Sequence, residues 1–114
     1  MPFITVKTNK EINNNTSLEI KQSLREAISL IPGKSEAWLM IEFEESKNMF
    51  FKGTSEDVAM IEVKVYGKPL NSKLLNNFTS EVTNIISRAL NISTTRIYIS
   101  YLFTEVWGYN GENF

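Results

Sequence analysis

The chain has 114 residues, of which 42% are hydrophobic and 22% are charged, and this is the composition of an ordinary globular protein. Twelve basic and thirteen acidic residues give a net charge of -1, which argues against a nucleic-acid partner because such proteins carry concentrated basic patches. The absence of cysteine and histidine excludes disulfides and thiolate chemistry and removes the usual zinc and haem ligands, so we expect no metal site.

The chain carries no signal peptide pattern, because the short apolar start is followed at once by polar residues. No apolar run approaches the roughly 20 residues of a membrane span. We therefore expect a cytoplasmic protein with no membrane partner.

The first half of the chain reads as strand, helix and strand. Phe3–Val6 is short, apolar and β-prone, and residues 10–15 form a polar loop. Thr16 and Glu19 fit a capping box at the start of a helix, which Pro32-Gly33 ends. Trp38–Phe43 alternates as a second strand. The apolar face expected for the helix has the spacing of one buried stripe: Ile20, Leu24, Ala27, Ile28 and Ile31.

The second half repeats this order. Met49–Phe51 is expected to form a short strand, and Val58–Tyr66 a long one that ends at Gly67-Lys-Pro69. Asn71 or Ser72 caps the second helix, and Ile97–Phe103 forms the last long strand before a turn-dense tail, residues 107–111. The second helix has its own apolar stripe: Leu75, Phe78, Val82, Ile85, Ile86, Ala89 and Leu90.

Two β-α-β units therefore follow each other. Residues 4–7 and 61–64 match in three of four positions, 57 positions apart. We expect one α+β domain over residues 1–114, with repeats of about 1–57 and 58–114 forming an α/β sandwich. Its four-stranded mixed sheet would carry two helices on one face. Because nothing in the chain remains to cover the other face, an oligomer is the natural way to bury it.

Pro2 is the most informative single residue. Initiator methionine is usually removed before proline, and Pro2 would then present a secondary amine that no internal position can supply. An α-amino group has a reference pKa of about 7.7–8.0, and burial or a nearby cation lowers that value. Such an amine could act as a general base at neutral pH. A chain that retains Met1 would have no free proline amine.

Several segments, taken together, resemble the tautomerase superfamily, and within it the group around macrophage migration inhibitory factor and D-dopachrome tautomerase. The resemblance spans the whole chain, and the order and spacing of the segments make it specific. The segments are Met-Pro at the start, Gly33-Lys34, Met49-Phe-Phe-Lys-Gly-Thr-Ser-Glu56, Ile61-Glu-Val-Lys64 with Gly67, Arg96-Ile-Tyr-Ile99, and Trp107-Gly-Tyr-Asn-Gly111 with Phe114.

This resemblance implies a homotrimer with active sites at the subunit interfaces and a C-terminal hairpin. It implies proton transfer between the oxygen and carbon of an enol, as in phenylpyruvate keto–enol exchange, without a cofactor. Secretion without a signal peptide is known in the family and would leave no trace in the sequence.

The resemblance also assigns candidate site residues. Pro2 would carry the proton, and Lys34 would lower the pKa of the amine and bind the anionic end of the substrate. Without the resemblance, Lys34 is a cation near a helix C-terminus, and the aromatic residues are core or interface filler. Tyr98 would approach from the neighbouring subunit. The pocket walls would be aromatic: Trp38, Tyr98, Trp107, Tyr109 and Phe114.

The chain departs from the family pattern at two pocket positions. Tyr66 stands where the family more often has a small aliphatic residue, so its bulk would narrow the pocket. Ser100 replaces an asparagine, and its hydroxyl has a shorter reach. Arg25, Arg88 and Arg96 do not lie where dehalogenase or decarboxylase branches place their arginines, which argues against those reactions.

The leading hypothesis is a cofactor-independent keto–enol tautomerase for phenylpyruvate-like 2-oxo acids. The alternative is a trimeric binding or signalling protein with weak or no activity, because fold alone does not decide function. A purely structural assembly domain is a third interpretation, which leaves the combination of Pro2, Lys34 and Tyr98 unexplained.

Overall fold

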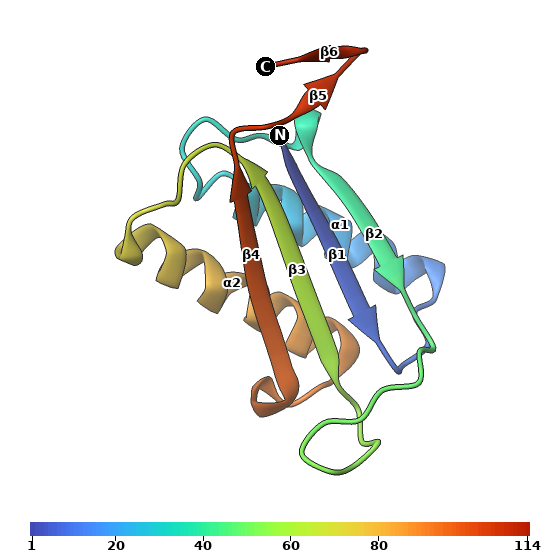
Figure 1. The fold of residues 1–114 in the computed structure, drawn as a ribbon. Coiled ribbons are helices and arrows are strands. Elements are labelled where there is room, and N and C mark those ends of the chain that lie inside the picture. The colour runs from blue at the N-terminus through green and yellow to red at the C-terminus, as the bar shows by residue number, and fades with distance from the viewer.

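A four-stranded mixed sheet carries two antiparallel helices on one face (Figure 1). The computed structural model describes residues 1–114. Along the chain the elements are β1 (Pro2–Thr8), α1 (Asn14–Ile28), η1 (Glu36–Trp38), β2 (Met40–Glu44), β3 (Ala59–Tyr66), α2 (Ser72–Leu90), η2 (Thr94–Arg96), β4 (Ile97–Thr104), β5 (Gly108–Tyr109) and β6 (Glu112–Asn113).

The strand order β2-β1-β3-β4 confirms the expected pair of β-α-β units. β1 pairs with β2, and β3 with β4, in parallel, whereas the central β1–β3 pair is antiparallel. In that pair Ile4 lies opposite Val63, Val6 opposite Ile61, and Thr5 opposite Glu62. The two halves are therefore related by an approximate twofold axis beside Thr5 and Glu62.

The hydrophobic core lies between the helices and the sheet. Both helical stripes predicted from spacing are used: α1 buries Ile20, Leu24, Ala27 and Ile28, and α2 buries Phe78, Val82, Ile85, Ile86 and Leu90. The sheet contributes alternate residues, among them Ile4, Val6, Ile61, Val63 and Val65. Neither helix is both long enough and apolar enough to cross a membrane.

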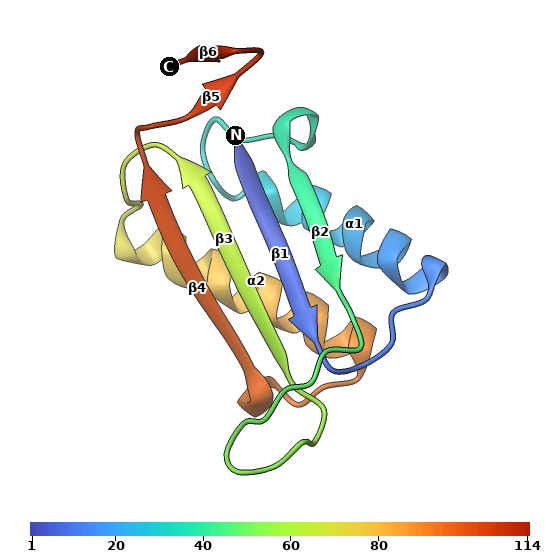
Figure 2. The same ribbon diagram turned by 45° about the vertical axis from the view of Figure 1, so that its right-hand side comes forward.

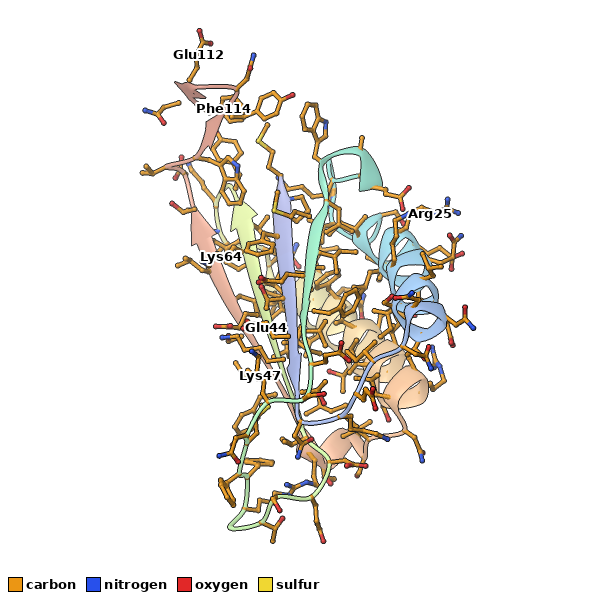
Figure 3. The ribbon with its side chains drawn as sticks, turned by 90° about the vertical axis from the view of Figure 1, so that its right-hand side faces the viewer. Arg25, Glu44, Lys47, Lys64, Glu112 and Phe114 are labelled. Carbon is orange, nitrogen blue, oxygen red and sulfur yellow. The ribbon has the colours of Figure 1, made fainter.

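The other face of the sheet has no cover (Figure 2). It carries an ion pair between the Lys7 Nζ and Glu62 Oε1, 2.6 Å apart, and a longer one of 3.9 Å to Glu44. Met40 and Leu102 on this face are more than half exposed. Lys64 and Glu44 point away from the helices here, whereas Arg25 projects from α1 on the far side (Figure 3).

Local predictions failed at four places. Helix α1 ends at Ile28 and not at Pro32-Gly33, so Ile31 is buried but lies outside the helix. The capping box of Thr16 and Glu19 is wrong, because the Asn13 side chain accepts the Thr16 backbone N–H and the helix begins at Asn14. Trp38 lies in η1 rather than in a strand, and β2 begins at Met40. Met49–Phe51 forms no strand, since only Phe51 makes an isolated bridge, to Thr54.

Of the two caps expected for the second helix, Asn71 or Ser72, the structure has Asn71, and this offers a stability test. The Asn71 side chain accepts the Leu74 N–H at 3.0 Å and caps α2. We expect Asn71→Ala to lower the free energy of unfolding by about 1 kcal/mol, measured by urea denaturation. Asn76→Ala, at an exposed position inside α2, is the matched control and should cost nothing, because alanine favours helix. Equal losses in both variants would contradict the capping role.

Candidate functional site

The chain start lies at the end of the sheet where the C-terminal hairpin folds over (Figure 1). Pro2 is the first residue of β1, is buried, and pairs with Val65 of β3. The carbonyl of Met1 accepts the Tyr66 N–H at 3.2 Å. The first residues are therefore held in the sheet by backbone pairing rather than left free.

Lys34 reaches this end because of the turn that follows the first helix. Gly33 has a φ of 77°, which is strained for any other residue, and the Lys34 N–H then donates to Ile31 at 3.1 Å. The Lys34 Nζ donates to the Tyr66 carbonyl at 2.9 Å and lies 5.8 Å from the centre of the Tyr66 ring. The turn thus places a fixed cation beside the chain start.

The electrostatic result is an amine that loses its proton easily. Burial, followed by the positive charge and hydrogen bonding of Lys34, lowers the pKa of the Met1 α-amino group from 8.0 to about 6. Burial and like charge both disfavour the protonated form. At pH 7 most of this amine is neutral, so an amine at this end of β1 can accept a proton.

A mostly apolar cavity of about 430 Å³ opens next to these residues. Its volume falls in the range of small-molecule sites. The Trp38 and Tyr109 rings pack edge to face in its wall, with centroids 5.1 Å apart. The lining comes from the chain start, from η1 with the start of β2, and from β5 with the residue before it: Met1, Pro2, Phe3, Ala37, Trp38, Leu39, Met40, Trp107, Gly108 and Tyr109.

The hairpin that closes the cavity follows from its sequence. Asn110 and Gly111 both have positive φ, 52° and 80°, as a two-residue hairpin turn requires. The Phe114 N–H donates to the Trp107 carbonyl at 3.0 Å. The Phe114 ring packs on Tyr66 with centroids 5.5 Å apart, and Phe114 lies at the top of the sheet in Figure 3.

Most of the site residues predicted from the sequence meet at this end: Pro2, Lys34, Trp38, Tyr66, Trp107, Tyr109 and Phe114. Tyr98 and Ser100 do not. They pair with Met60 and Glu62 of β3, whereas Pro2 pairs with Val65. Five residues of strand correspond to about 17 Å, so Tyr98 lies well away from the cavity of its own chain.

Sequence reasoning missed other residues that line the cavity, including Phe3, Leu39 and Met40. Phe3 and Met40 are direct neighbours in the β1–β2 register. The β1–β2 register could have indicated them. Phe3 follows Pro2, so its side chain faces away from the helices and lies beside Met40, the first residue of β2. No group of acidic, histidine or cysteine side chains in the chain is arranged to hold a metal ion.

Comparisons with known proteins agree over the whole chain. The model of the macrophage migration inhibitory factor (MIF) family, which is part of the tautomerase superfamily, matches residues 1–114. Rat macrophage migration inhibitory factor is 27% identical over 119 aligned residues, covering 100% of this chain and 99% of the relative.

Two solved structures illustrate the likeness in three dimensions. The crystal structure of Leishmania major MIF2 superposes with a TM-score of 0.92 at 23% identity, covering 100% of this chain and 97% of the other. A homologue from Prochlorococcus marinus is 28% identical with a TM-score of 0.78, and 98% of each chain is covered. The chain belongs to the macrophage migration inhibitory factor family.

Proposed function

We propose that this protein is a cofactor-independent keto–enol tautomerase for phenylpyruvate-like 2-oxo acids, with Pro2 as general acid and base after removal of Met1. The observation that carries the proposal is the Lys34 ammonium beside the partly buried Met1 amine, whose pKa is lowered to about 6; the Pro2 amine exposed by removal of Met1 would lie in the same surroundings. A neutral amine next to an apolar cavity suits proton transfer on a substrate with an aromatic ring and an anionic end.

The proposed reaction moves one proton and needs no other reactant. In the direction from enol to ketone, the Pro2 nitrogen takes the enol O–H proton, and the resulting ammonium returns a proton to the neighbouring carbon. Lys34 binds the carboxylate as a charge-assisted partner. The aromatic walls, among them Trp38 and Tyr109, would hold the ring of the substrate.

The site is proposed to be completed by a neighbouring subunit. Proteins of this family are typically homotrimers. The open sheet face and the unpaired outer edges of β2 and β4 support assembly, because exposed edges and apolar side chains are usually covered. In the trimer, Tyr98 and Ser100 of one subunit would join the Pro2 cavity of the next.

The direct test is enol-to-ketone conversion of phenylpyruvate by protein whose mass proves that Met1 is absent. We expect activity in this form and much less in protein that retains Met1, because the Pro2 nitrogen is then an amide without a basic lone pair and the only α-amino group lies one residue away, on Met1. Equal activity in both forms would overturn the assignment of Pro2.

Mixing of subunits tests the shared site. Pro2→Gly and Tyr98→Ala should each have low activity alone, and trimers re-formed from a one-to-one mixture should regain about a quarter of the wild-type sites. Activity is measured after dilution from mild denaturant, with light scattering to confirm the assembly state. A mixture no more active than the two parents would contradict a site built from two subunits.

A binding or signalling protein remains the second candidate, and one observation favours it. The Tyr66 ring packs near both Lys34 and Phe114, 5.8 Å from the Lys34 Nζ and 5.5 Å from the Phe114 ring centre. We infer that the bulk of this ring narrows the access of a substrate to the Lys34 ammonium. Full processing of Met1 without any activity toward phenylpyruvate would favour this second function.

A further inference from the structure

The Tyr98 ring packs against a loop rather than against the hydrophobic core. Tyr98 is 60% exposed, and its side chain packs edge to face on the ring of Phe51, with centroids 4.7 Å apart. Phe51 lies in the segment between β2 and β3, which contains no helix or strand. The orientation of Tyr98 therefore depends on how firmly this segment is held.

Arg96 holds the segment through its guanidinium group. The guanidinium donates to four backbone carbonyls of residues 51–57, those of Phe51, Thr54, Glu56 and Asp57, at distances of 2.9 to 3.5 Å. It also lies 5.3 Å from the centre of the Phe51 ring. One planar group thus joins the second half of the loop, residues 51–57, to the aromatic ring on which Tyr98 packs.

A lysine could not replace this arrangement. The five N–H donors of arginine form a rigid planar fork, whereas an ammonium is a compact charge on a flexible stem. The loop also contains residues with positive φ, Lys52 at 52° and Gly53 at 78°. Asn9 also holds the loop, through the carbonyls of Ser55 and Glu56, but the guanidinium bonds the Phe51 carbonyl as well. Without the arginine, ordering the backbone at Phe51 would therefore cost conformational entropy with one fewer anchor to offset it.

We infer that Arg96 and Phe51 are positioning residues that hold Tyr98 in the orientation needed by the neighbouring subunit. Arg96 orders the loop, the loop places Phe51, and Phe51 fixes one face of Tyr98. The inference rests on the proposed function in one respect, which is that Tyr98 contacts the substrate of the adjacent site.

A double-mutant cycle on substrate binding tests the catalytic consequence. Phe51→Ala is expected to raise KM for phenylpyruvate about three- to tenfold, the usual value of an aromatic pair, with a smaller change in kcat. In a Tyr98→Ala background the same substitution should change KM by less than about twofold, because the residue that it positions is gone. Phe50→Ala is the matched control, since the neighbouring Phe50 is 71% exposed. An equal rise in both backgrounds, or no rise at all, would overturn the inference.

Nuclear magnetic resonance of ring-labelled tyrosine provides a readout that needs no activity. We expect one sharp set of Tyr98 ring signals in the wild-type protein, and broadened or multiple signals in Arg96→Lys, which keeps both the charge and the Phe51 ring. Arg88→Lys, at an exposed position in α2, should leave the Tyr98 signals unchanged. Unchanged signals in Arg96→Lys would refute the positioning role.

The two measurements separate the two proposals. One outcome is that the wild-type protein has no tautomerase activity while Arg96→Lys loses the order of the Tyr98 ring. This would overturn the proposed function and leave the positioning role intact. The opposite outcome is activity that depends on Pro2, with unchanged Tyr98 ring signals in Arg96→Lys. This would support the proposed function and overturn the positioning role.

Discussion

Replacing Pro2 with glycine is expected to lower kcat/KM for phenylpyruvate by about 100-fold or more in protein that has lost Met1. General acid–base catalysis of this kind is typically worth about 10²- to 10⁴-fold. Glycine still supplies an amine, but it lacks the ring by which Pro2 is buried at the start of β1. Its nitrogen is therefore neither fixed in position nor shielded from water. Initial rates of ketone formation, with the intact mass of each sample, measure this effect.

Pro69→Gly is the matched control, because Pro69 is exposed in the loop before α2 and should leave kcat/KM unchanged. Light scattering on both variants separates a loss of chemistry from a loss of assembly. Wild-type activity in an assembled and processed Pro2→Gly protein would remove Pro2 from the mechanism.

Replacing Lys34 with methionine should lower kcat/KM about 10- to 100-fold at pH 7. A hydrogen bond to a charged group is worth about 1.5–3 kcal/mol, and methionine keeps the length of the side chain without its charge. KM should carry most of the loss, because Lys34 is proposed to bind the carboxylate. Michaelis profiles with phenylpyruvate separate KM from kcat.

The pH profile gives a second signature of the Lys34 substitution. In the processed wild type, activity should fall as the pH drops through the pKa of the Pro2 amine, which we expect to be lowered by the same causes that lower the pKa of the Met1 α-amino group to about 6. Removing the like charge favours the protonated amine, so the acidic limb should move to higher pH. It should move only part of the way to 8.0, because burial is the larger cause of the shift and remains. Lys68→Met, at an exposed position, should leave the limb in place. An unmoved limb in Lys34→Met would show that Lys34 does not tune the amine.

The order of elements could be predicted because it depends on long periodic patterns. Two apolar stripes have a spacing that fits a helix and not a strand. They bury Ile20, Leu24 and Ile28 in α1, and Phe78, Val82 and Ile86 in α2. Helix starts depend on single hydrogen bonds, so Asn13 could displace Thr16 as the cap within an equally polar stretch. The strand expected at Met49–Phe51 failed because its backbone meets no partner strand beyond the bridge of Phe51 to Thr54.

The candidate site could be predicted in part, because resemblance supplies residue types but not the distances between them. Lys34 reaches the chain start through a turn whose glycine is visible in the sequence. The contribution of Met40 depends on the β1–β2 register, and the second strand was predicted to begin at Trp38, two residues before its actual start. The support of Tyr98 by Phe51 and Arg96 joins segments more than 40 residues apart, and no local pattern indicates it.

The approximate twofold axis beside Thr5 and Glu62 has a consequence for how many reaction centres each subunit can hold. Under this axis Ile4 corresponds to Ile61, so the counterpart of Pro2 is Ala59, at the opposite end of the sheet. Removal of Met1 would free the Pro2 nitrogen, but the Ala59 nitrogen always belongs to a peptide bond and cannot bind a proton at neutral pH. The order of elements is duplicated while the proposed proton carrier is not, and in the proposed trimer that end would present Tyr98, whose partner in register is Met60, to another subunit.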